Sequence, residues 1–330
     1  MRFLAEAFKE DRQRKELTQA DLAELSGVSV PTIKNIEANR RSLLTPEDKS
    51  LKLLCDVLNT DIKKYFKRDC KVITIQCHKG GCAKTTTTAN IAYSLHKLGK
   101  KVLVIDTDAQ LNLTYHFNMQ LNASKNFYTA FSNRTSLAEQ IVPTQYEGLD
   151  IITNHTSAAN LDMNIFILER REYIMQEILQ EIKDSGEYDY ILIDCAPALN
   201  QLNKSILYAT DELLIPVEPS PFGLLGLHDL NTLYQTVKKN APQLNLIGLV
   251  ITQYDAREIA QQGMAENALE EFKGDTIVLN TRIPRDANVK KSQVFRQPLI
   301  ECFPRTRATY AYMTLTKEII SIIESRELNE

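Results

Sequence analysis

A short glycine-rich segment with two lysines and two threonines is the part of this sequence best suited to chemistry. It runs from Lys79 to Thr86 and reads KGGCAKTT. The β-rich run VITIQC precedes it and the helical run TTANIAYSLHKLG follows it, which is the setting of a phosphate-binding loop. Backbone N–H groups at a helix start bind phosphate oxygens, and the helix dipole helps them. We therefore expect a nucleotide phosphate site here, rather than a tight turn that happens to contain these residues.

The residue types in this loop suit the binding of phosphates. Gly80 and Gly81 allow backbone torsions and a close approach that a side chain would block. Lys84 is expected to reach the β- and γ-phosphates, and the Thr85 hydroxyl to ligate Mg²⁺. The phosphate-binding set is completed by the other loop residues, Lys79, Cys82, Ala83 and Thr86. A thiol at a helix start can have a lowered pKa, but a small packing residue is the favoured role of Cys82.

Three aspartates follow two further β-rich runs. The run KVLVID ends in Asp106, with Asp108 two residues later, and the run YDYILID ends in Asp194. A single aspartate after a strand is usually a turn residue or a helix cap. Chemistry in an open α/β sheet lies at the carboxyl ends of its strands. Three such aspartates after a phosphate loop therefore indicate a functional edge of a sheet.

The loop and these strand ends resemble the ParA/MinD group of ATPases. The loop lacks the last glycine of an ordinary P-loop, since Ala83 stands there, and it carries the additional Lys79 at its front. This arrangement is similar to the group's deviant P-loop, KGGxxK[ST][ST], whose front lysine reaches across a dimer to the other subunit's nucleotide. The resemblance covers about residues 71–325. It implies ATP and Mg²⁺ as cofactors and a homodimer in which Lys79 acts in trans.

The resemblance also implies roles for the aspartates. LVIDTDAQ looks like the family's LxDxDPQ, which makes Asp108 the residue that positions the attacking water and Asp106 a carboxylate near the metal. Asp194 matches the Walker B residue that holds Mg²⁺ through water. Phosphoryl transfer needs positioning and charge neutralisation, which Lys79, Lys84 and Mg²⁺ would supply. The sequence departs from the family at Cys82, Ala83, Ala109 and Ala196, where Val, Gly, Pro and Pro are common.

The elements that must position these residues are short strands alternating with helical segments. The β-rich runs are Lys71–Cys77, Lys101–Asp106, Leu149–Thr153, Tyr190–Asp194, Glu212–Val217, Leu244–Thr252 and Thr276–Thr281. Their alternation with helices predicts an α/β fold with a doubly wound, mostly parallel sheet. Their near-continuous Val, Ile and Leu content is typical of strands covered on both faces. We expect this ATPase domain to span residues 71–330.

Residues 1–68 are expected to form a separate, small all-α domain. Within Leu17–Glu37, Gly27 permits a turn and Ser29 is a good N-cap for the helix that follows. The apolar stripe of the first helix and the buried face of the second are supplied by Ala20, Leu22, Ala23, Leu25, Ile33 and Ile36. This is a helix-turn-helix arrangement. It resembles the Cro/repressor (XRE) family, with its pattern Q-x-x-L-A-x-x-x-G-V-S-x-x-x-I-x-x-I-E.

The second helix of this motif is expected to enter the major groove of an operator. Contacts to DNA are expected from Ser29, from Val30, Thr32, Lys34 and Asn35, which face outward, and from Gln19, which matches a phosphate-contacting position. We interpret Arg12 and Glu37 as an ion pair between helices. A helical dimerisation module that has lost DNA binding stays open as an alternative, because the second helix is not strongly basic.

A basic segment lies near the C-terminal end of a chain whose net charge is −3. Thr281–Arg307 contains seven basic and two acidic residues. Such an excess can bind the phosphates of DNA without regard to sequence, although by itself it is usually a solvated face. The segment resembles the ParA segment IPRN…EA…GKPV…P.SR. The resemblance implies that Arg285 and Arg307 bind non-specific DNA in the ATP-bound dimer.

Composition and patterning exclude several classes of protein. Of the 330 residues, 43% are hydrophobic, so the chain can bury a core and is not mainly disordered. It has no long apolar stretch and no secretory signal, so we expect a cytoplasmic, nucleoid-associated protein without a membrane partner. The six cysteines form no CxxC pair, which argues against a zinc site and a disulfide framework. A MinD-like membrane oscillator would need a basic amphipathic C-terminal helix, which this sequence does not have. An iron–sulfur reductase would need a second cysteine ligand to accompany Cys195, and the sequence offers none.

These features together predict an ATP-dependent DNA partition ATPase of a plasmid or other mobile element. Its ATP-sandwich dimer binds DNA, and a ParB-like centromere-binding protein triggers hydrolysis, whose intrinsic rate is slow. The N-terminal domain binds an operator and regulates the protein's own operon. The alternative is a nucleotide-sensing transcriptional regulator whose ATPase module is a dimerisation switch. ATP-dependent binding to random DNA distinguishes the two functions.

Overall fold

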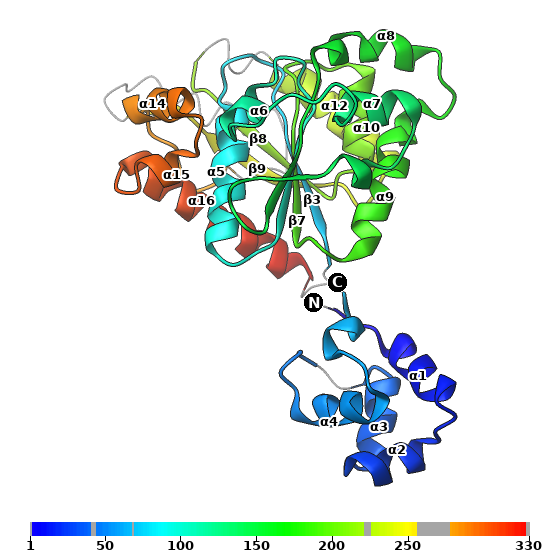
Figure 1. The fold of residues 1–330 in the computed structure, drawn as a ribbon. Helices are drawn as coiled ribbons and strands as arrows, with labels where there is room; N and C mark the ends of the chain where they lie inside the picture. The colour runs from blue at the N-terminus through cyan, green and yellow to red at the C-terminus, as the bar shows by residue number, and fades with distance from the viewer. Residues whose placement is uncertain (1, 41–43, 68, 221–225, 256–277, 328–330) are drawn as a thin grey trace. The chain divides into compact units, whose positions relative to one another are not determined.

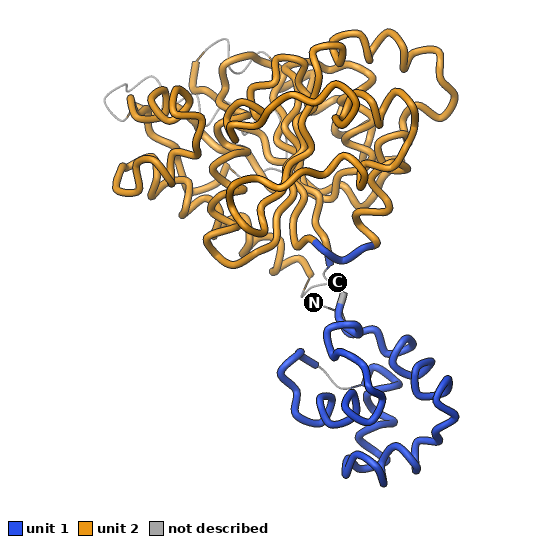
Figure 2. The backbone as a smooth tube through the Cα atoms, viewed as in Figure 1, with its two compact units in different colours: residues 1–69, 185–187 blue, residues 70–184, 188–330 orange. Residues whose placement is uncertain are grey.

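The computed structural model describes residues 2–40, 44–67, 69–220, 226–255 and 278–327. The chain forms two compact units (Figure 2). The N-terminal unit is Met1–Asp69 with Ser185–Glu187, and the sheet unit is Cys70–Asp184 with Tyr188–Glu330. The main division therefore falls just before the first strand of the large sheet.

The N-terminal unit is mainly helical. Its helices are α1 (Ala5–Arg14), α2 (Gln19–Ser26), α3 (Val30–Glu37), α4 (Lys49–Leu58) and the 3₁₀-helix η1 (Ile62–Tyr65). Two strands of two residues each, β1 (Arg2–Phe3) and β2 (Phe66–Lys67), pair antiparallel. The prediction of an all-α unit was wrong in this detail, because a two-residue strand is too short to show alternation in a sequence.

Capping residues fix the connection between α2 and α3. Thr18 and Asp21 form a capping box at the start of α2. Gly27 ends that helix with a φ of +72°, a conformation that favours glycine. Ser29 caps α3, and its hydroxyl accepts a hydrogen bond from the Thr32 N–H. The turn and the N-cap predicted from the sequence are thus confirmed.

The core of this unit forms where α2, α3 and α4 meet. Leu22, Ile33 and Ile36 are fully buried there, as predicted. The apolar stripe predicted for α2 was wrong at both ends, since Ala20 is exposed and Leu25 is 61% exposed. Ala20 lies two residues before Leu22 and so on nearly the opposite face of the helix, at roughly 100° per residue.

The sheet unit is built on one seven-stranded sheet. Its strands are β3 (Lys71–Ile75), β4 (Val102–Asp106), β5 (Val142–Pro143), β6 (Leu149–Ile152), β7 (Tyr190–Asp194), β8 (Glu212–Val217) and β9 (Asn245–Ile251). Their order is β5-β6-β4-β7-β3-β8-β9, and every pairing is parallel except that of β5 with β6. The mostly parallel sheet is therefore confirmed.

Two edges of the sheet differ from the sequence prediction. The antiparallel edge strand β5 was not predicted, because a Val-Pro pair carries no periodic signal. The run Thr276–Thr281 was predicted as a strand, but its first two residues lie outside the described part of the chain. Of its described residues, Val278 forms an isolated parallel bridge with Leu249.

Helices cover both faces of the sheet (Figure 1). One face carries α5 (Lys84–Lys97) and α16 (Arg307–Glu327), with α14 (Ala287–Phe295) and α15 (Leu299–Cys302) beside them. The other face carries α7 (Phe127–Asn133), α8 (Leu161–Phe166), α9 (Ile174–Ser185), α10 (Gln201–Tyr208) and α12 (Leu227–Asn240). The short helix α6 (Asn112–His116) follows β4. This is the doubly wound arrangement.

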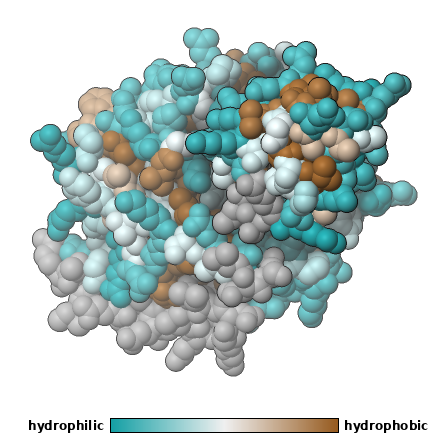
Figure 3. Space-filling view, turned by 90° about the horizontal axis from the view of Figure 1, so that it is seen from below, coloured by the Kyte–Doolittle hydropathy of each residue, from teal (hydrophilic) through white to brown (hydrophobic). Residues whose placement is uncertain are grey.

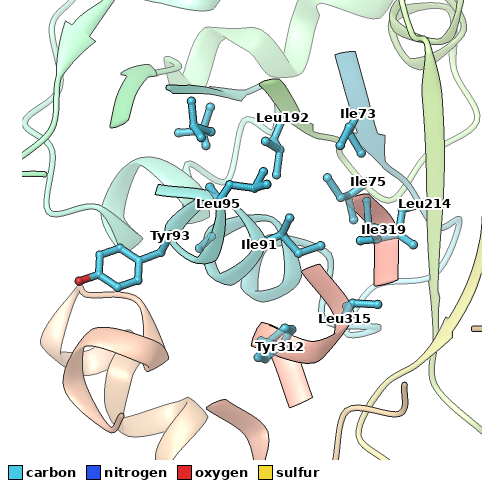
Figure 4. Packing of buried hydrophobic residues seen from close by; sticks show 14 of the residues in the cluster. Ile73, Ile75, Ile91, Tyr93, Leu95, Leu192, Leu214, Tyr312, Leu315 and Ile319 are labelled. Atoms are coloured by element: carbon cyan, nitrogen blue, oxygen red, sulfur yellow. The ribbon is translucent and has the colours of Figure 1, made fainter. Parts of the chain in front are cut away.

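Alternate residues of each strand pack against opposite layers. Ile73 and Ile75 of β3 face α5 and α16 (Figure 4), whereas Val72 packs in the cluster on the other face. Ile91 of α5 and Leu315 of α16 are fully buried in the first cluster. Both faces of the strands are thus covered by packed side chains, which explains their continuous runs of apolar residues.

On the face drawn in Figure 3, hydrophilic residues predominate and hydrophobic residues gather in separate patches. Within the described residues, no helix combines the length and apolar character needed to cross a membrane.

Candidate nucleotide-binding site

The strand order brings the predicted site residues to one edge of the sheet. The glycine-rich loop follows β3, Asp106 ends β4 and Asp194 ends β7. β7 lies between β3 and β4, and Asp106 and Asp194 are partners in the register of two parallel strands. The carboxyl ends of these strands therefore present the loop and the acidic side chains together, as the sequence predicted.

The loop has the backbone shape and the open space that phosphates require. Gly81 has a φ of +83°, which an L-residue rarely adopts. A Cβ atom added at Gly80 or Gly81 would meet no atom within 4 Å, so room for phosphate oxygens lies beside both residues. Ala83 also lies in the left-handed region, with a φ of +66°, and is the N-cap of α5. Ala83, which stands where an ordinary P-loop has a glycine, thus has a backbone conformation typical of glycine.

The two lysines of the loop have different surroundings. Lys84 is buried, and its Nζ donates to the Lys79 carbonyl at 3.0 Å, so it lies across the mouth of the loop. Lys79 is half-buried, and its Nζ lies 2.6 Å from Glu218 Oε2 and 3.3 Å from Ser220 Oγ. Glu218 was not identified from the sequence. The sequence feature that could have identified Glu218 is its position directly after β8, which places a carboxylate at the same edge of the sheet.

The predicted metal-binding residues Thr85 and Asp194 are in direct contact. Thr85 Oγ1 donates to Asp194 Oδ2 at 2.6 Å, and Thr88 Oγ1 donates to Asp194 Oδ1 at 3.4 Å. Burial, and next the nearby Asp106 carboxylate, raise the pKa of Asp194 to about 8. A cation beside this carboxylate would favour its charged form.

The donor set fits Mg²⁺ bound together with a nucleotide. Within the described ranges, no group of three or more His, Cys, Asp or Glu side chains could hold a metal by itself. Mg²⁺ prefers oxygen ligands and usually combines one or two protein oxygens with phosphate and water oxygens. The Thr85 hydroxyl and the Asp194 carboxylate supply such oxygens next to the phosphate loop.

The two aspartates after β4 are placed differently. Asp106 is fully buried, and its carboxylate accepts from Thr114 N at 2.8 Å, Thr114 Oγ1 at 2.7 Å and Asp108 N at 3.1 Å. Burial raises the pKa of Asp106 to about 6, against the lowering effect of the Thr114 hydrogen bonds. Asp108 lines the cavity beside the loop, and its Oδ1 accepts from Gln110 N at 3.0 Å. Only Asp108 of these two therefore faces the cavity.

A cavity of about 820 Å³ extends from the loop to α6 and α14. Its lining includes Lys84, Thr85 and Thr86 from the loop side and Asp108 from the strand edge. The volume falls within the usual range of small-molecule sites, roughly 300–1,000 Å³. A nucleotide would therefore find both a phosphate cradle and adjoining space.

Three polar residues that the sequence reasoning missed hold the loop in place. Thr252 Oγ1 donates to the Cys82 carbonyl at 3.1 Å, and Gln253 Nε2 donates to the Gly81 carbonyl at 2.6 Å. Gln293 of α14 donates from its Nε2 to Thr86 Oγ1 at 3.1 Å. Neutral side chains far along the chain carry no local signal of such a role.

The cysteine inside the loop lies against the backbone of that loop. Cys82 is buried, and its Sγ donates to the Lys79 carbonyl at 3.2 Å. A hydrogen bond with Cys77, followed by burial, raises the pKa of the Cys82 thiol. The lowered pKa that its place at a helix start allowed is therefore absent.

The two arginines predicted to bind DNA are both exposed. Arg285 lines the same cavity as the phosphate loop, and its backbone N–H donates to the Tyr254 carbonyl at 3.0 Å. Arg307 is the first residue of α16 and does not line that cavity. The structure thus places Arg285 next to the nucleotide site.

The residues predicted to bind an operator lie on or beside α3. Ser29, Lys34 and Asn35 are exposed, whereas Val30 and Thr32 are half-buried and do not face fully outward as predicted. They belong to the first turn of the helix, where the Ser29 and Thr32 hydroxyls lie 2.8 Å apart.

An ion pair and a hydrogen bond link helices α1, α2 and α3 of the N-terminal unit. Arg12 donates from Nε to Glu37 Oε1 at 2.6 Å and from Nη2 to Oε2 at 2.9 Å, which confirms the predicted pair. Gln19 Nε2 donates to Glu37 Oε2 at 2.8 Å. The side chain of Gln19, which was predicted to contact a DNA phosphate, thus forms a hydrogen bond within the unit.

Two protein families match the chain. The AAA domain family AAA_31 matches residues 70–246, and the helix-turn-helix family HTH_3 matches residues 8–64. The chromosome partitioning protein ParA of Caulobacter vibrioides is 30% identical over 259 residues, which cover 78% of this chain and 96% of the relative. The sporulation initiation inhibitor protein Soj of Bacillus subtilis is 31% identical, with 76% of this chain and 98% of the relative covered.

Solved structures share the fold of the sheet unit. The cell division ATPase MinD of Pyrococcus furiosus aligns with a TM-score of 0.62 at 22% identity, over 76% of this chain and 99% of that one. The cobyrinic acid a,c-diamide synthase of Mycobacterium smegmatis, with bound ADP and magnesium, aligns with a TM-score of 0.67 at 22% identity, over 78% and 96%. At this identity the likeness concerns the fold alone.

Proposed function

Because this chain belongs to the ParA/MinD-type family of P-loop ATPases, we propose that it is an ATP-dependent DNA partition ATPase of a plasmid or other mobile element. The observation that carries the proposal is the contact of Thr85 with Asp194 beside a loop that holds both Lys79 and Lys84. In this proposal residues 71–330 are the ATPase domain and residues 1–68 an operator-binding domain of a cytoplasmic, nucleoid-associated protein.

The loop and its neighbours bind and hydrolyse ATP. Lys84 contacts the β- and γ-phosphates, and the backbone N–H groups of the loop cradle them. Thr85 and Asp194 would hold Mg²⁺, which would neutralise charge on the phosphates. Asp106 contributes negative charge nearby and orders the segment that carries Asp108.

Asp108 orients the attacking water, because it is the strand-end carboxylate that faces the cavity. A carboxylate is a weak general base, so intrinsic turnover is slow. Lys79 stabilises charge on the nucleotide of the other protomer in an ATP-sandwich dimer. Its ion pair with Glu218 within the chain must open before it can do so.

The dimer binds DNA of any sequence through Arg285 and Arg307. Both side chains are exposed, and Arg285 shares its cavity with the phosphate loop, which supports a link between bound ATP and DNA contact. A ParB-like centromere-binding protein triggers hydrolysis and so releases the DNA.

The helix-turn-helix binds an operator and regulates the protein's own operon. Helix α3 and its N-cap present Ser29, Lys34 and Asn35 to solvent, with Val30 and Thr32 in the first turn. Gln19 contacts Glu37, the last residue of this helix. Recognition helices of this kind read base edges with their N-terminal residues.

A second candidate function is a nucleotide-sensing transcriptional regulator whose ATPase module acts as a dimerisation switch. The observation that favours it is the well-capped α3, which is ready to read an operator without further folding. ATP-dependent binding to random DNA separates the candidates, since only a partition ATPase must hold bulk DNA.

Replacement of the buried loop lysine tests the nucleotide site itself. In Lys84→Ala, ATP affinity falls about 100-fold or more, because a buried charged partner of the phosphates is lost. The measurement is titration with a fluorescent ATP analogue together with phosphate release. Normal turnover in this variant would remove the basis of the proposal.

A further inference from the structure

Helix α14 presents two lysines and two apolar side chains to solvent. Lys290 and Lys291 are exposed, and the exposed fractions are 78% for Val294 and 59% for Phe295. Residues four apart are neighbours on the surface of a helix, so each lysine adjoins one of the apolar side chains. The opposite side of the helix packs on the fold, since Ser292 is buried. The exposed face of α14 therefore combines positive charge with an apolar end.

The ring of Phe295 is held in place although it is exposed. It stacks on the ring of Phe303, with the centroids 6.0 Å apart and an interplanar angle of 23°. Phe303 is half-buried and packs against the core cluster that contains α5 and α16. Apolar surface left in water is unfavourable, and a partner that covers it is favoured. The fixed ring is therefore suited to receive a flat apolar group.

Further positive charge lies close to this ring along the chain. Arg296, the next residue, is exposed, and its guanidinium lies 5.6 Å from the ring centroid of Tyr115. Arg305 and Arg307 are exposed and follow Phe303 by two and four residues. Within the described part of the chain, none of these three arginines forms an ion pair with an acidic side chain. A polyanion would therefore meet charge that the described residues do not neutralise.

The same helix is in contact with the phosphate loop. Lys290, Gln293 and Arg296 line the nucleotide cavity. The Gln293 amide donates to Thr86 Oγ1 of the loop at 3.1 Å. The lysines and the exposed phenylalanine thus lie on a helix that borders the candidate nucleotide site.

We propose that the exposed face of α14 and the segment 303–307 bind single-stranded DNA, with a base stacked on Phe295 and phosphates held by the surrounding cations. Sites for single strands combine a positively charged surface with aromatic side chains on which bases stack. In a duplex each base is already stacked on its neighbours, so a fixed ring gains a base only from a single strand or an opened step. The inference goes beyond the proposed function, in which Arg285 and Arg307 hold duplex DNA.

A lipid surface fits this face less well than a nucleic acid does. Helices that lie in a membrane interface bury a broad apolar face along their length. The large exposed apolar side chains of α14 are Val294 and Phe295, which are adjacent in sequence and span less than one turn. Cations predominate around them, and these are the groups that bind phosphates along a strand.

A single tryptophan tests the stacking directly. The chain contains no tryptophan, so Phe295→Trp places one fluorescent reporter at the proposed position. The full chain is titrated, with and without a slowly hydrolysed ATP analogue, with a strand of about 16 thymine nucleotides. A strand of the same length and charge that lacks the bases is the comparison. We expect the thymine strand to quench the tryptophan emission and the strand without bases to leave it nearly unchanged.

Affinity measurements separate stacking from charge. Phe295→Ala lowers affinity for the thymine strand about 5- to 150-fold, the effect of one lost stack between a base and an aromatic ring, and leaves its salt dependence unchanged. Phe295→Tyr retains the affinity. Lys291→Ala weakens the salt dependence, because one phosphate contact is lost. The matched control is Phe166→Ala, which removes an equally exposed phenylalanine (61%) from α8 and leaves affinity unchanged.

Equal affinity for the two strands, or no quenching of the new tryptophan, overturns the inference. So does binding to vesicles of phosphatidylglycerol and phosphatidylcholine that Phe295→Ala abolishes, with no binding to the thymine strand. ATP-dependent binding to a random duplex without binding to the thymine strand overturns this inference and leaves the proposed function. Strand binding that depends on Phe295, in a chain that neither hydrolyses ATP nor binds the duplex, supports the inference and overturns the proposed function.

Discussion

At the scale of residues, chemical type alone does not determine what an aspartate does. Asp106 and Asp194 are both fully buried, yet the first is held by Thr114 and the second by Thr85 of the phosphate loop. Asp108 lines the cavity instead. The same side chain thus has three settings within one sheet edge, and only the last of the three lines the cavity.

Replacement of Asp108 separates hydrolysis from assembly. In Asp108→Ala we expect an ATP-dependent dimer whose rate of ATP hydrolysis is lower by about 100-fold or more, the usual size of a lost proton-handling group. Lys79→Ala is the contrasting variant, and we expect it to lose the dimer, because Lys79 acts in trans in the proposed dimer. Light scattering with ATP and phosphate release measure the two properties. Loss of the dimer in Asp108→Ala would make this residue structural.

A buried histidine predicts how stability depends on pH. His116 lines the cavity, is 4% exposed, and its Nε2 has no hydrogen-bond partner among the described residues. Burial lowers the pKa of His116 from 6.5 to about 4. The unfolded chain therefore binds more protons between these values, so stability is present above pH 6.5 and is lost as the pH falls towards 4.

His116→Phe tests this dependence. Between pH 6.5 and 4 the variant loses less free energy of unfolding than the unaltered chain. The difference is roughly 3 kcal/mol, because each pH unit that separates the folded from the unfolded pKa is worth about 1.4 kcal/mol. Urea unfolding at a series of pH values gives the difference. Parallel pH profiles would show that His116 carries its proton equally well folded and unfolded.

At the scale of elements, the strands could be predicted well because both faces of the sheet are covered. A continuous apolar run such as Tyr190–Asp194 fits a strand that is buried on both faces. The short pairs β1–β2 and β5–β6 left no pattern, since two residues cannot show a period. Element length therefore decided which parts of the fold could be predicted.

The residues of the candidate site likewise divide into those that the sequence could identify and those that it could not. The loop residues and the three aspartates could be found because their types are rare together and stand next to strands. Thr252, Gln253 and Gln293 could not, because each acts on the loop from a distant part of the chain. Their contacts exist only once the sheet and α14 are assembled, so no local spacing encodes them.

The helix-turn-helix offers two variants with opposite effects. Arg12→Ala leaves the buried Glu37 carboxylate without its bidentate partner and lowers stability by about 3–5 kcal/mol. Lys34→Ala alters an exposed side chain and changes stability by no more than about 0.5 kcal/mol, yet it weakens operator binding. Thermal unfolding and DNA binding measure both. Full operator affinity in Lys34→Ala would show that this side chain takes no part in DNA contact, and no operator binding by the unaltered chain would favour the dimerisation module.

At the scale of the whole molecule, the charge distribution limits how the chain can meet DNA. The net charge is −3, whereas Thr281–Arg307 carries seven basic and two acidic residues. Binding to bulk DNA must therefore come from a local surface and must weaken as salt rises. Because Arg285 borders the nucleotide cavity, that surface is expected to depend on the bound nucleotide.

Binding to a duplex of random sequence tests the central claim most directly. The chain and an Arg285→Ala/Arg307→Ala variant are compared without nucleotide and with ADP, ATP or a slowly hydrolysed ATP analogue, at fixed salt. We predict binding only with ATP or the analogue, and its loss in the variant. Affinity confined to one promoter, with no ATP-dependent binding to random DNA, would contradict a partition ATPase and leave a transcriptional regulator with a nucleotide switch.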